Sequence, residues 1–316
     1  MNMSFLDSEI AEVKAVIRSA VRITDPFARS AIGDLVDAGG KFLRPKILIL
    51  SAMTGKYDPE AIRPLAAAVE LLHTATLIHD DVIDDSPSRR GIPSAHVRIG
   101  RKNAVLSGDY LFSRCFQLAA KRTSPENAGL LAGAISLIVS AELEQDAGRW
   151  KFSPSKRSCF RKIGGKTAVL FSLAARAGAV EAKSSQTVVS ALTRSAWAAG
   201  VAFQIQDDIL DWQGNESELG KTVLNDLAEG FCTLPLAFAL ATESASLSPL
   251  LSPEAVFDGS SSEVLRIVKR SGALDRSSDL AKVWCERSLR NLAKVPQSFA
   301  RDQLTLIFSS FVDRKK

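Results

Sequence analysis

Hydrophobic side chains recur along most of this chain at the spacing of an amphipathic helix. Residues 5–23 carry one broad apolar stripe, which is typical of a helix that packs on a core. A longer apolar run follows Pro64, over residues 65–83. Few polar residues interrupt it, so this helix is expected to be buried nearly all round. Further helices are predicted at residues 103–120, 128–147, 156–178, 185–212, 230–244, 262–270, 276–293 and 300–313.

Clusters of proline, glycine and serine separate these helical segments. The longest is the serine-rich stretch at residues 243–262, which we expect to be a mobile loop. The sequence has no repeat of fixed period, no alternation of strands and helices, and no Pro/Gly-rich linker between two halves. It therefore predicts an all-α fold in a single domain over residues 1–316, a large bundle of about ten or more helices.

Composition and charge narrow the class of protein. Aromatic residues make up only 7% of the chain, which favours helices over a β-sandwich. The net charge of +5 is small, and basic and acidic residues are mixed along the chain. A nucleic-acid-binding protein usually gathers its basic residues into a stripe. No nucleic-acid partner is therefore predicted.

The cysteines and the N-terminal residues indicate in which cellular compartment the protein is expected. The cysteines lack CxxC spacing, which argues against a zinc site or a disulfide framework and suits a reducing cytoplasm. They are Cys115, Cys159, Cys232 and Cys285. The acidic residues within residues 1–18 do not fit a signal peptide, and no run of about 18 apolar residues indicates a membrane span. We expect a cytoplasmic protein without a transmembrane segment.

Aspartates cluster at the end of the long apolar helix, in HDDVIDD at residues 79–85. Asp80 and Asp84 are one turn apart and share a helical face, with Asp81 beside them. Like charges at this spacing repel one another and are costly to bury unpaired, so the group needs a cationic partner. Mg²⁺, which binds carboxylate and phosphate oxygens, fits. For this cluster alone, a solvated helix end is the alternative interpretation.

A second cluster repeats the first. In FQIQDDILD, residues 203–211, the adjacent Asp207 and Asp208 are followed by Asp211, again behind an apolar helix. Two such groups on buried helices far apart in sequence are hard to explain as surface decoration, so both are interpreted as metal-binding. A group of Mg²⁺ ions implies a polyanionic ligand, and diphosphate is the natural candidate.

Basic residues in glycine-containing segments supply the positive charge that a diphosphate needs. They lie in GGKFLRP at 39–45, RRG at 89–91, GGKT at 164–167 and GKT at 220–222. Neither glycine-lysine element has the full P-loop spacing or a preceding strand, which argues against a nucleotide triphosphate. All three histidines lie near the first aspartate cluster. A histidine on an apolar helix is more often a core residue, although His73 can donate to a phosphate. The other two are His79 and His96.

These motifs resemble those of the trans-type polyprenyl diphosphate synthases, which include farnesyl, geranylgeranyl and longer-chain enzymes. The resemblance runs from about Lys41 to Pro235. It rests on GGKFLRP, HTATLIHDDVIDDSPSRRG (73–91), GKTAVLF (165–171), FQIQDDILD and LGK (219–221). It implies the isoprenoid synthase fold, in which helices surround a central substrate cavity. It also implies a prenyltransferase that extends an allylic diphosphate with isopentenyl diphosphate.

The resemblance implies a role for each matching residue. Six aspartates would bind the Mg²⁺ ions, about three per active site: Asp80, Asp81, Asp84, Asp207, Asp208 and Asp211. The allylic diphosphate would contact Arg89, Lys166 and Lys221. Isopentenyl diphosphate would be held by Lys41, Arg44, His73 and Arg90. The allylic cation would be stabilised by Thr167 and Gln204.

The implied chemistry agrees with the residue types. A diphosphate leaves only if its developing charge is neutralised, which metal ions and Lys or Arg side chains achieve. The allylic cation must be kept from water, which suits an apolar helix wall next to a charged end. The isopentenyl double bond then attacks, and a proton is lost, with the released diphosphate as the base in the family.

Three positions depart from the family pattern. Phe231 stands where the family commonly has Lys, Leu224 where it often has Gly, and Thr222 where Pro is frequent. Loss of a cation at position 231 can weaken diphosphate binding or alter the closing loop. None of these changes touches the aspartates, so the catalytic interpretation is kept.

Small residues upstream of the first aspartate cluster bear on product length. In the family, the product grows down a channel beneath this cluster, and bulky residues just upstream stop it. Ala75 and Thr76 are small, which suggests a product of hexaprenyl to decaprenyl length. Thr76 lies one turn from Asp80 on the same face, whereas the role of Ala75 rests on the family alone. Phe112 or Phe116, on the next helix, can form the floor of this channel.

The family is usually dimeric, and residues 106–118 are a candidate interface for a homodimer. Some long-chain members are heterodimers in which one subunit lacks the aspartates. This chain would be the catalytic subunit of such a pair. Transient membrane contact for product release is compatible with this scheme.

Two alternatives stay open at this point. One is a terpene cyclase or head-to-head condensing enzyme of the same fold, although two aspartate motifs and a separate basic site argue against it. The other is a non-catalytic subunit of a heteromeric synthase. The intact aspartates argue against that reading, whereas Phe231 and Leu224 mildly favour it.

Overall fold

The computed structural model describes residues 3–37, 40–89, 91–152, 155–213 and 224–313. Within these ranges the chain is almost entirely helical. The only strands there are β1 (Ser88–Arg89) and β2 (Ile92–Pro93), which pair antiparallel. The all-α prediction is thereby confirmed. Arg90, Lys221 and Thr222 lie outside the described residues.

The chain divides into two compact units, each assembled from three separated stretches. The first unit comprises Met1–Ala134, Leu173–Thr193 and Lys294–Leu304. The second unit comprises Ile135–Ser172, Arg194–Ala293 and Thr305–Lys316. Neither unit is a contiguous N- or C-terminal segment. The single domain expected over residues 1–316 stays a prediction.

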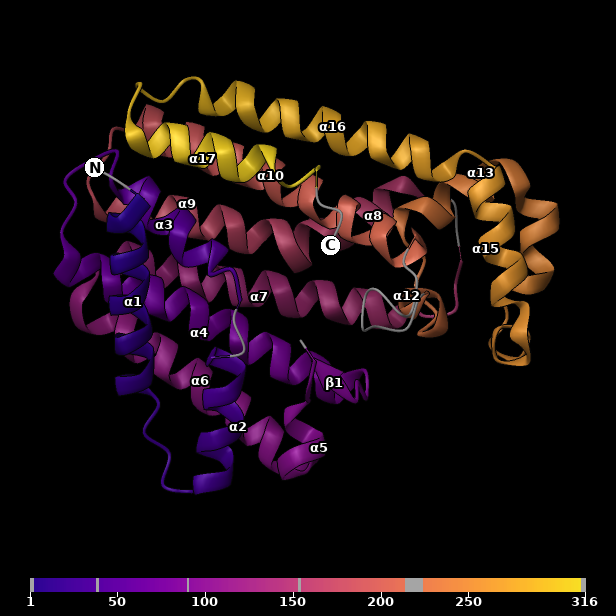
Figure 1. Cartoon of the computed structure of the whole chain (residues 1–316), viewed down its shortest axis with the longest axis horizontal. Helices are drawn as coiled ribbons and strands as arrows, with labels where there is room; N and C mark the ends of the chain where they lie inside the picture. The colour runs from indigo at the N-terminus through magenta and orange to yellow at the C-terminus, as the bar shows by residue number, and fades with distance from the viewer. Residues whose placement is uncertain (1–2, 38–39, 90, 153–154, 214–223, 314–316) are drawn as a thin grey trace. The chain divides into compact units, whose positions relative to one another are not determined.

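Helix α4 (Pro59–Ile83) is the centre of the first unit (Figure 1). The helices of this unit that pack against α4 are α1 (Met3–Ala20), α3 (Leu43–Ala52), α5 (Ala95–Ile99) and α6 (Arg101–Arg122). Helix α2 (Pro26–Asp37) packs against α5 and α6. The periodicity of the sequence did not predict α2 or α3.

Helix α4 begins earlier than its apolar run. The Asp58 side chain accepts a hydrogen bond from the Glu60 N–H at 3.1 Å, and Pro59 occupies the first turn, where its missing N–H costs nothing. Every residue from Leu65 to Leu72 is buried. The prediction of a helix buried nearly all round is thus confirmed over this stretch.

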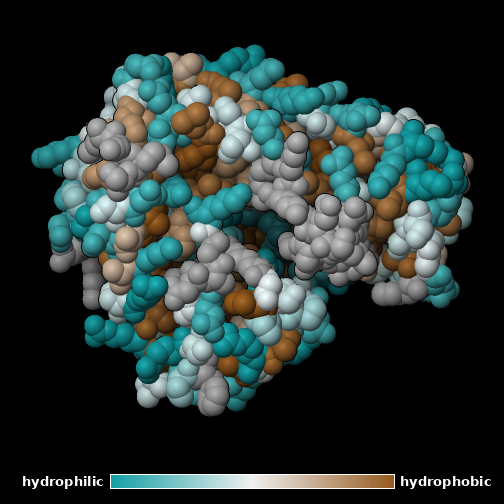
Figure 2. Space-filling model, in the orientation of Figure 1, coloured by the Kyte–Doolittle hydropathy of each residue, from teal (hydrophilic) through white to brown (hydrophobic). Residues whose placement is uncertain are grey.

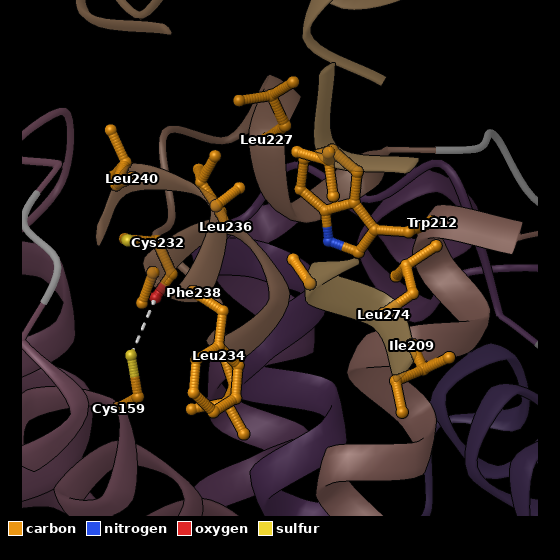
Figure 3. Packing of buried hydrophobic residues seen from close by; sticks show 14 of the residues in the cluster. Cys159, Ile209, Trp212, Leu227, Cys232, Leu234, Leu236, Phe238, Leu240 and Leu274 are labelled. Atoms are coloured by element: carbon orange, nitrogen blue, oxygen red, sulfur yellow. Dashed lines mark hydrogen bonds between the residues drawn. The ribbon is translucent and has the colours of Figure 1, made fainter. Parts of the chain in front are cut away.

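The second unit is organised around α13 (Leu234–Leu247), which packs against α8 (Lys156–Ile163), α15 (Ser261–Arg270) and α16 (Ala273–Leu292). Figure 3 shows part of its buried apolar cluster. The Trp212 indole N–H donates to the Thr233 hydroxyl at 3.2 Å, and the Cys159 thiol donates to the Cys232 carbonyl oxygen at 3.7 Å. Because Ile209 and Trp212 belong to this cluster, it anchors the helix end that carries the second aspartate motif.

Of the helices that the structure describes, four contribute residues to both units. They are α7 (Pro125–Ala147), α9 (Val169–Glu181), α10 (Gln186–Gln213) and α17 (Phe299–Ser309). Helices α8 and α9 were predicted as one helix over residues 156–178. Instead, the π-helical turn η1 (Gly164–Ala168) separates them.

The serine-rich stretch at residues 243–262, predicted to be a loop, is largely helical. It contains the end of α13, the 3₁₀ turn η2 (Ser248–Leu250), α14 (Pro253–Ala255) and the π-helical turn η3 (Val256–Ser260). The Ser252 hydroxyl oxygen accepts a hydrogen bond from the Ala255 N–H at 3.1 Å, which caps α14. The loop prediction was wrong because serine begins short helices as readily as it forms turns.

Among the described residues, two helices, α4 and α7, are long and apolar enough to cross a membrane by length and composition, although none was expected. The apolar window of α4 is 67% buried, as in a core helix, whereas that of α7 is 22% buried. In Figure 2, hydrophilic residues cover much of the visible face and hydrophobic residues appear in patches between them. For α4, burial within the fold accounts for the apolar composition.

Candidate active site

The first aspartate group lies where α4 ends. The Asp84 N–H donates to the Asp80 carbonyl oxygen at 2.8 Å, and the chain then leaves the helix at Asp85, whose φ is 50°. Asp80 and Asp84 are partly exposed, Asp85 is exposed, and Asp81 is fully buried. The two aspartates that share a helical face are therefore reached by solvent, whereas the one beside them is enclosed by protein.

Asp81 is paired with Arg89. Both Nε and Nη2 of Arg89 lie 2.6 Å from Asp81 Oδ1. The β1–β2 hairpin orders Arg89, and Gly91, with φ of 78°, allows its tight turn. The other carboxylate oxygen of Asp81 is buried and has no hydrogen-bond partner among the described residues. Burial raises the pKa of Asp81, although Arg89 acts in the opposite direction.

His96 and His79 have structural partners. His96 is buried and its Nε2 lies 3.3 Å from Asp85, which also binds Arg101 at 2.6 Å. The His79 ring lies against Gly108, where a Cβ would come within 2.2 Å of Nε2. The view that a histidine on an apolar helix is usually a packing residue therefore fits His79.

The residues predicted to hold isopentenyl diphosphate, where described, belong to the first unit. Lys41 is exposed, Arg44 is partly buried in the first turn of α3, and His73 is partly exposed on α4. The fourth, Arg90, lies outside the described residues. Their contact with a diphosphate stays a prediction.

The residues predicted to set product length differ in environment. Ala75 is fully buried in α4, whereas Thr76 is partly exposed and its hydroxyl donates to a backbone carbonyl oxygen of the same helix at 2.8 Å. On α6, the Phe112 ring packs against His79 with 5.4 Å between centroids, and Phe116 is 39% exposed. Of the two phenylalanines, Phe112 is thus the one in contact with a side chain next to the first aspartate motif.

The second aspartate group lies at the end of α10. Asp207 is exposed, Asp211 is partly exposed, and Asp208 is buried. The Asp211 carboxylate accepts hydrogen bonds from the N–H groups of Asn225 (3.1 Å) and Asp226 (3.3 Å), at the start of α12 (Asn225–Ala228). Asp226 was assigned no role from the sequence. No local signal could place it here, because the contact spans 15 residues.

Carboxylates of the second group carry like charge at close range. Burial, reinforced by Asp226, raises the pKa of Asp208 well above its ordinary value and that of Asp211 to about 7. Hydrogen bonds from Gln204 to Asp208, and from the start of α12 to Asp211, oppose this rise without cancelling it. Such a surplus of negative charge favours a bound cation.

Mg²⁺ fits both groups in ligand type, because carboxylate oxygens are the protein ligands it prefers. In the part of the chain that the structure describes, no three His, Cys, Asp or Glu side chains lie close enough to hold an ion by themselves. Mg²⁺ commonly keeps several waters and binds through one or two carboxylates plus substrate phosphates. The donor set is compatible with such shared coordination.

The π-helical turn η1 presents Lys166 and Thr167. Gly165 within it lies so close to α7 that a Cβ would come 2.1 Å from the Ala141 Cβ. Lys166 Nζ is 3.5 Å from the Glu142 carboxylate. Single π-helical turns between α-helical segments are frequent at functional sites.

Thr167 is linked to the second aspartate motif by hydrogen bonds. Its hydroxyl donates to Gln204 Oε1, and Gln204 Nε2 donates to Asp208 Oδ1 at 3.0 Å. Thr167 and Gln204 were predicted to stabilise the allylic cation, and Asp208 to bind metal. The structure joins all three in one chain of contacts.

Phe231 is buried at the position where the resemblance led us to expect a lysine. The Arg149 guanidinium lies 4.9 Å from its ring centroid, and Lys162 Nζ lies 6.0 Å from it. Gly230, with φ of 81°, turns the chain against Trp150, where a Cβ would come within 2.6 Å of the indole. The Phe231 ring, which stands in place of the expected lysine, therefore has two cationic side chains close to it.

Comparison with known proteins decides the family. The model of the polyprenyl synthetase family matches residues 25–265. The chain belongs to the polyprenyl synthetase family. A heptaprenyl diphosphate synthase component 2 from Geobacillus stearothermophilus is 35% identical over 303 residues, which cover 95% of this chain and 94% of the relative. A nonaprenyl diphosphate synthase from Mycobacterium tuberculosis is 31% identical over 309 residues, covering 96% and 92%.

Solved structures of family members agree with the fold. The crystal structure of a decaprenyl diphosphate synthase from Rhodobacter capsulatus superposes with a TM-score of 0.92 at 33% identity, covering 99% of this chain and 98% of the other. These comparisons confirm the predicted family and the isoprenoid synthase fold. They also confirm the predicted enzyme class, a prenyltransferase that elongates a prenyl diphosphate chain. A terpene cyclase, a head-to-head condensing enzyme and a non-catalytic subunit are not favoured.

Proposed function

We propose that this polyprenyl synthetase family member condenses an allylic diphosphate with isopentenyl diphosphate repeatedly, with Mg²⁺, to a long all-trans polyprenyl diphosphate. The observation that carries the proposal is the pair of aspartate motifs, each at the end of an apolar helix. Burial and neighbouring carboxylates raise the pKa of three of their side chains: Asp81, Asp208 and Asp211. Groups of this kind favour a state with a bound cation.

The Mg²⁺ ligands would be the aspartates of the two motifs that solvent reaches: Asp80, Asp84, Asp207 and Asp211. The sequence also assigned Asp81 and Asp208 to the metal. Both are buried and hydrogen-bonded to a neighbouring side chain, so we give them supporting positions. Bound Mg²⁺, about three ions per active site as the resemblance implies, would neutralise the departing diphosphate.

Arg89 and Lys166 would bind the allylic diphosphate, together with Lys221. Each of the first two has an acidic partner: Asp81 for Arg89, and Glu142 for Lys166. A cation whose side chain is already ordered loses less conformational entropy when a phosphate binds. Both partners therefore prepare the basic residues for the substrate.

Isopentenyl diphosphate would be held by Lys41, Arg44, His73 and Arg90, which donate to its phosphate oxygens. The bond between the allylic carbon and the diphosphate oxygen breaks first, and Thr167 and Gln204 would offer oxygen lone pairs to the cation that forms. Attack by the isopentenyl double bond then makes the new carbon–carbon bond. The proton lost from the adjacent carbon goes to the released diphosphate, which restores a double bond.

The product would be hexaprenyl to decaprenyl in length. Ala75 and Thr76 are small and would leave space for the chain next to the first aspartate motif, and Phe112 on α6 would form the floor of this channel. The relatives with long-chain names support this length, since they include heptaprenyl, nonaprenyl and decaprenyl diphosphate synthases.

The chain would act as a cytoplasmic homodimer, or as the catalytic subunit of a heterodimer. The buried cysteines suit the cytoplasm, and the name of the Geobacillus relative, component 2, fits a heteromeric enzyme. Large apolar side chains stay exposed on α6 and α7: Val105, Leu106, Phe116, Leu137, Val139 and Leu143. They would be covered by the partner subunit, and a part of them could meet a membrane transiently while product is released.

The test is incubation of the purified protein with Mg²⁺, labelled isopentenyl diphosphate and, in separate reactions, geranyl, farnesyl or geranylgeranyl diphosphate. A Mg²⁺-dependent ladder of all-trans products is expected, with rates at least about a thousandfold lower in Asp80→Ala and Asp207→Ala. A cyclic or head-to-head product would contradict the proposal. Light scattering on the same preparation measures the oligomeric state.

A further inference from the structure

Thr167, Gln204 and Asp208 form a continuous chain of hydrogen bonds within the second unit. The Thr167 hydroxyl donates to Gln204 Oε1, and Gln204 Nε2 donates to Asp208 Oδ1 at 3.0 Å. Thr167 and Asp208 are each only 6% exposed, so water competes little at either end. Gln204 and Asp208 lie one turn apart on α10, whereas Thr167 lies on η1. The chain therefore ties the π-helical turn to the aspartate motif.

The orientation of the Gln204 amide sets the direction of these hydrogen bonds. Its NH₂ group faces Asp208 Oδ1, and because an amide nitrogen only donates, Asp208 is the acceptor. The amide then presents its oxygen to Thr167, and only the Thr167 hydroxyl can supply the proton between them. The Thr167 proton is thereby committed to Gln204, and the remaining lone pairs of the hydroxyl oxygen stay available as acceptors.

Backbone packing holds the three groups at this spacing. Gly200 lies one turn before Gln204 on α10, against Ala168 of η1. A Cβ at position 200 would come 2.6 Å from the Ala168 Cα. Any larger residue would push α10 away from η1 and separate Gln204 from Thr167. The approach of the two elements thus depends on a residue without a side chain.

We propose that Asp208 is a positioning residue for the allylic cation and not a direct metal ligand. It would fix the Gln204 amide and, through it, the Thr167 hydroxyl, so that oxygen lone pairs and no N–H or O–H hydrogens are presented to the developing positive charge. This inference rests on the proposed function. Dipoles oriented before the reaction stabilise developing charge without the cost of reorganising. A reversed amide would release the Thr167 proton and turn a hydrogen toward the cation.

The Asp208→Asn variant tests this role, because asparagine has nearly the same size but can present either an oxygen or an NH₂ group to Gln204. We expect kcat to fall about 10- to 100-fold, while the KM of both substrates and the half-saturating Mg²⁺ concentration change by less than about twofold. Asp207→Asn is the matched control from the same motif, and it should raise the Mg²⁺ requirement. A comparable rise in Asp208→Asn would overturn the proposal.

Binding without turnover gives a second readout. Mg²⁺ with inorganic diphosphate is expected to raise the Tm of Asp208→Asn by as much as it raises that of the wild type, because Asp208 does not hold the ion. The same addition should leave the Tm of Asp207→Asn nearly unchanged. Loss of the Mg²⁺-dependent shift in Asp208→Asn would place Asp208 among the metal ligands instead.

A double-mutant cycle with Gln204→Met asks whether Asp208 acts through the amide. Gln204→Met alone should lower kcat about as much as Asp208→Asn, and the two together should cost less than about twofold more. If the reduction in kcat in the double variant equals the product of the two single reductions, the proposal is overturned. A kcat equal to that of the wild type in Gln204→Met would also overturn the proposal. This measurement can be made even if Asp208→Asn fails to fold.

The outcomes separate this inference from the function on which it rests. A wild-type protein that makes no prenyl product with any primer contradicts the proposed function itself. An active wild type whose two variants give independent losses contradicts only the role assigned to Asp208.

Discussion

Arg89 approaches a single carboxylate oxygen of Asp81 with two nitrogen atoms, since Nε and Nη2 both lie 2.6 Å from Oδ1. The other oxygen, Oδ2, is buried and has no hydrogen-bond partner among the described residues. The Asp81 side chain is 0% exposed, whereas that of Arg89 is 27% exposed. The aspartate is therefore an internal anchor, and the arginine is the member of the pair that an anionic substrate can reach.

Replacing Asp81 by Asn should affect both stability and substrate binding. The free energy of unfolding should rise at neutral pH, because burial raises the pKa of Asp81 and the folded state therefore favours a neutral side chain at this position. The KM of the allylic diphosphate should rise about tenfold, because Arg89 loses its fixed orientation. Urea denaturation and initial rates measure the two effects.

Asp85→Asn is the matched control for that experiment. Asp85 binds Arg101 at the same 2.6 Å, but the two side chains are 70% and 57% exposed. Exposed ion pairs contribute little, so a loss below about 0.5 kcal/mol is expected. An equal rise in the KM of the allylic diphosphate in the Asp81 and Asp85 variants would contradict the view that burial makes the first pair important.

The pKa of Asp211, raised to about 7 from its ordinary 3.8, makes the stability of the metal-free protein depend on pH. The folded state favours the protonated carboxyl, so its contribution is fully present below the unfolded-state pKa and is lost as the pH rises through about 7. Asp211→Asn imitates the protonated form. In EDTA it should be more stable than the wild type above about pH 7, and the difference should shrink toward about pH 4.

Thermal unfolding in EDTA across this pH range checks the Asp211 prediction. Adding Mg²⁺ and inorganic diphosphate above about pH 7 should stabilise the wild type more than the variant, because metal binding requires a deprotonated ligand. A difference in Tm that stays constant across the pH range would show that the Asp211 carboxyl does not titrate as expected.

Gly165 should not tolerate a side chain. A Cβ there would come 2.1 Å from the Ala141 Cβ, so Gly165→Ala is expected to lower the free energy of unfolding by about 2 kcal/mol or more. It should also lower kcat, since Lys166 and Thr167 belong to the same π-helical turn. Gly133→Ala, on the helix that carries Ala141, is the control, because nothing lies within 4 Å of its Cβ. That variant should gain up to about 1 kcal/mol, as measured by chemical denaturation.

Ala75→Phe is expected to shorten the prenyl product, because a large ring would occupy the proposed channel next to the first aspartate motif. Ala66→Phe is the control. Ala66 is equally buried on α4 but lies about half a turn away around the helix axis. Each variant should cost about 1–3 kcal/mol of stability through overpacking, whereas only Ala75→Phe should change the product lengths on chromatography. An unchanged ladder in Ala75→Phe would remove the channel assignment.

Local pattern was sufficient for α4 and for the two aspartate motifs. The apolar run over residues 65–83 had to be buried whatever packed against it, and the i, i+4 spacing of Asp80 and Asp84 placed them on one face. The spacing of Asp207 and Asp211 does the same on α10. These features follow from helix geometry, which acts over a few residues and is therefore readable from the sequence.

Contacts between segments that are distant in sequence could not be predicted from any local pattern. Asp226 reaches the Asp211 carboxylate only because α12 begins at that point in space. The serine-rich stretch at residues 243–262 has the composition of a loop, yet Ser252 caps a short helix within it. In both cases the same residue types are compatible with several local conformations, and packing selects one.

The sequence alone determined that this protein is helical, that it carries two aspartate groups on apolar helices, and that its motifs belong to prenyl transfer. The tertiary structure decided which aspartate of each adjacent pair is buried, and what that residue holds. Asp81 and Asp80 look alike in sequence, but the packing of α4 encloses only Asp81, beside Arg89. Thr167 and Gln204 lie 37 residues apart, and they meet because two helical elements pack closely. Close packing depends on the shape of all its neighbours at once, which no local period encodes.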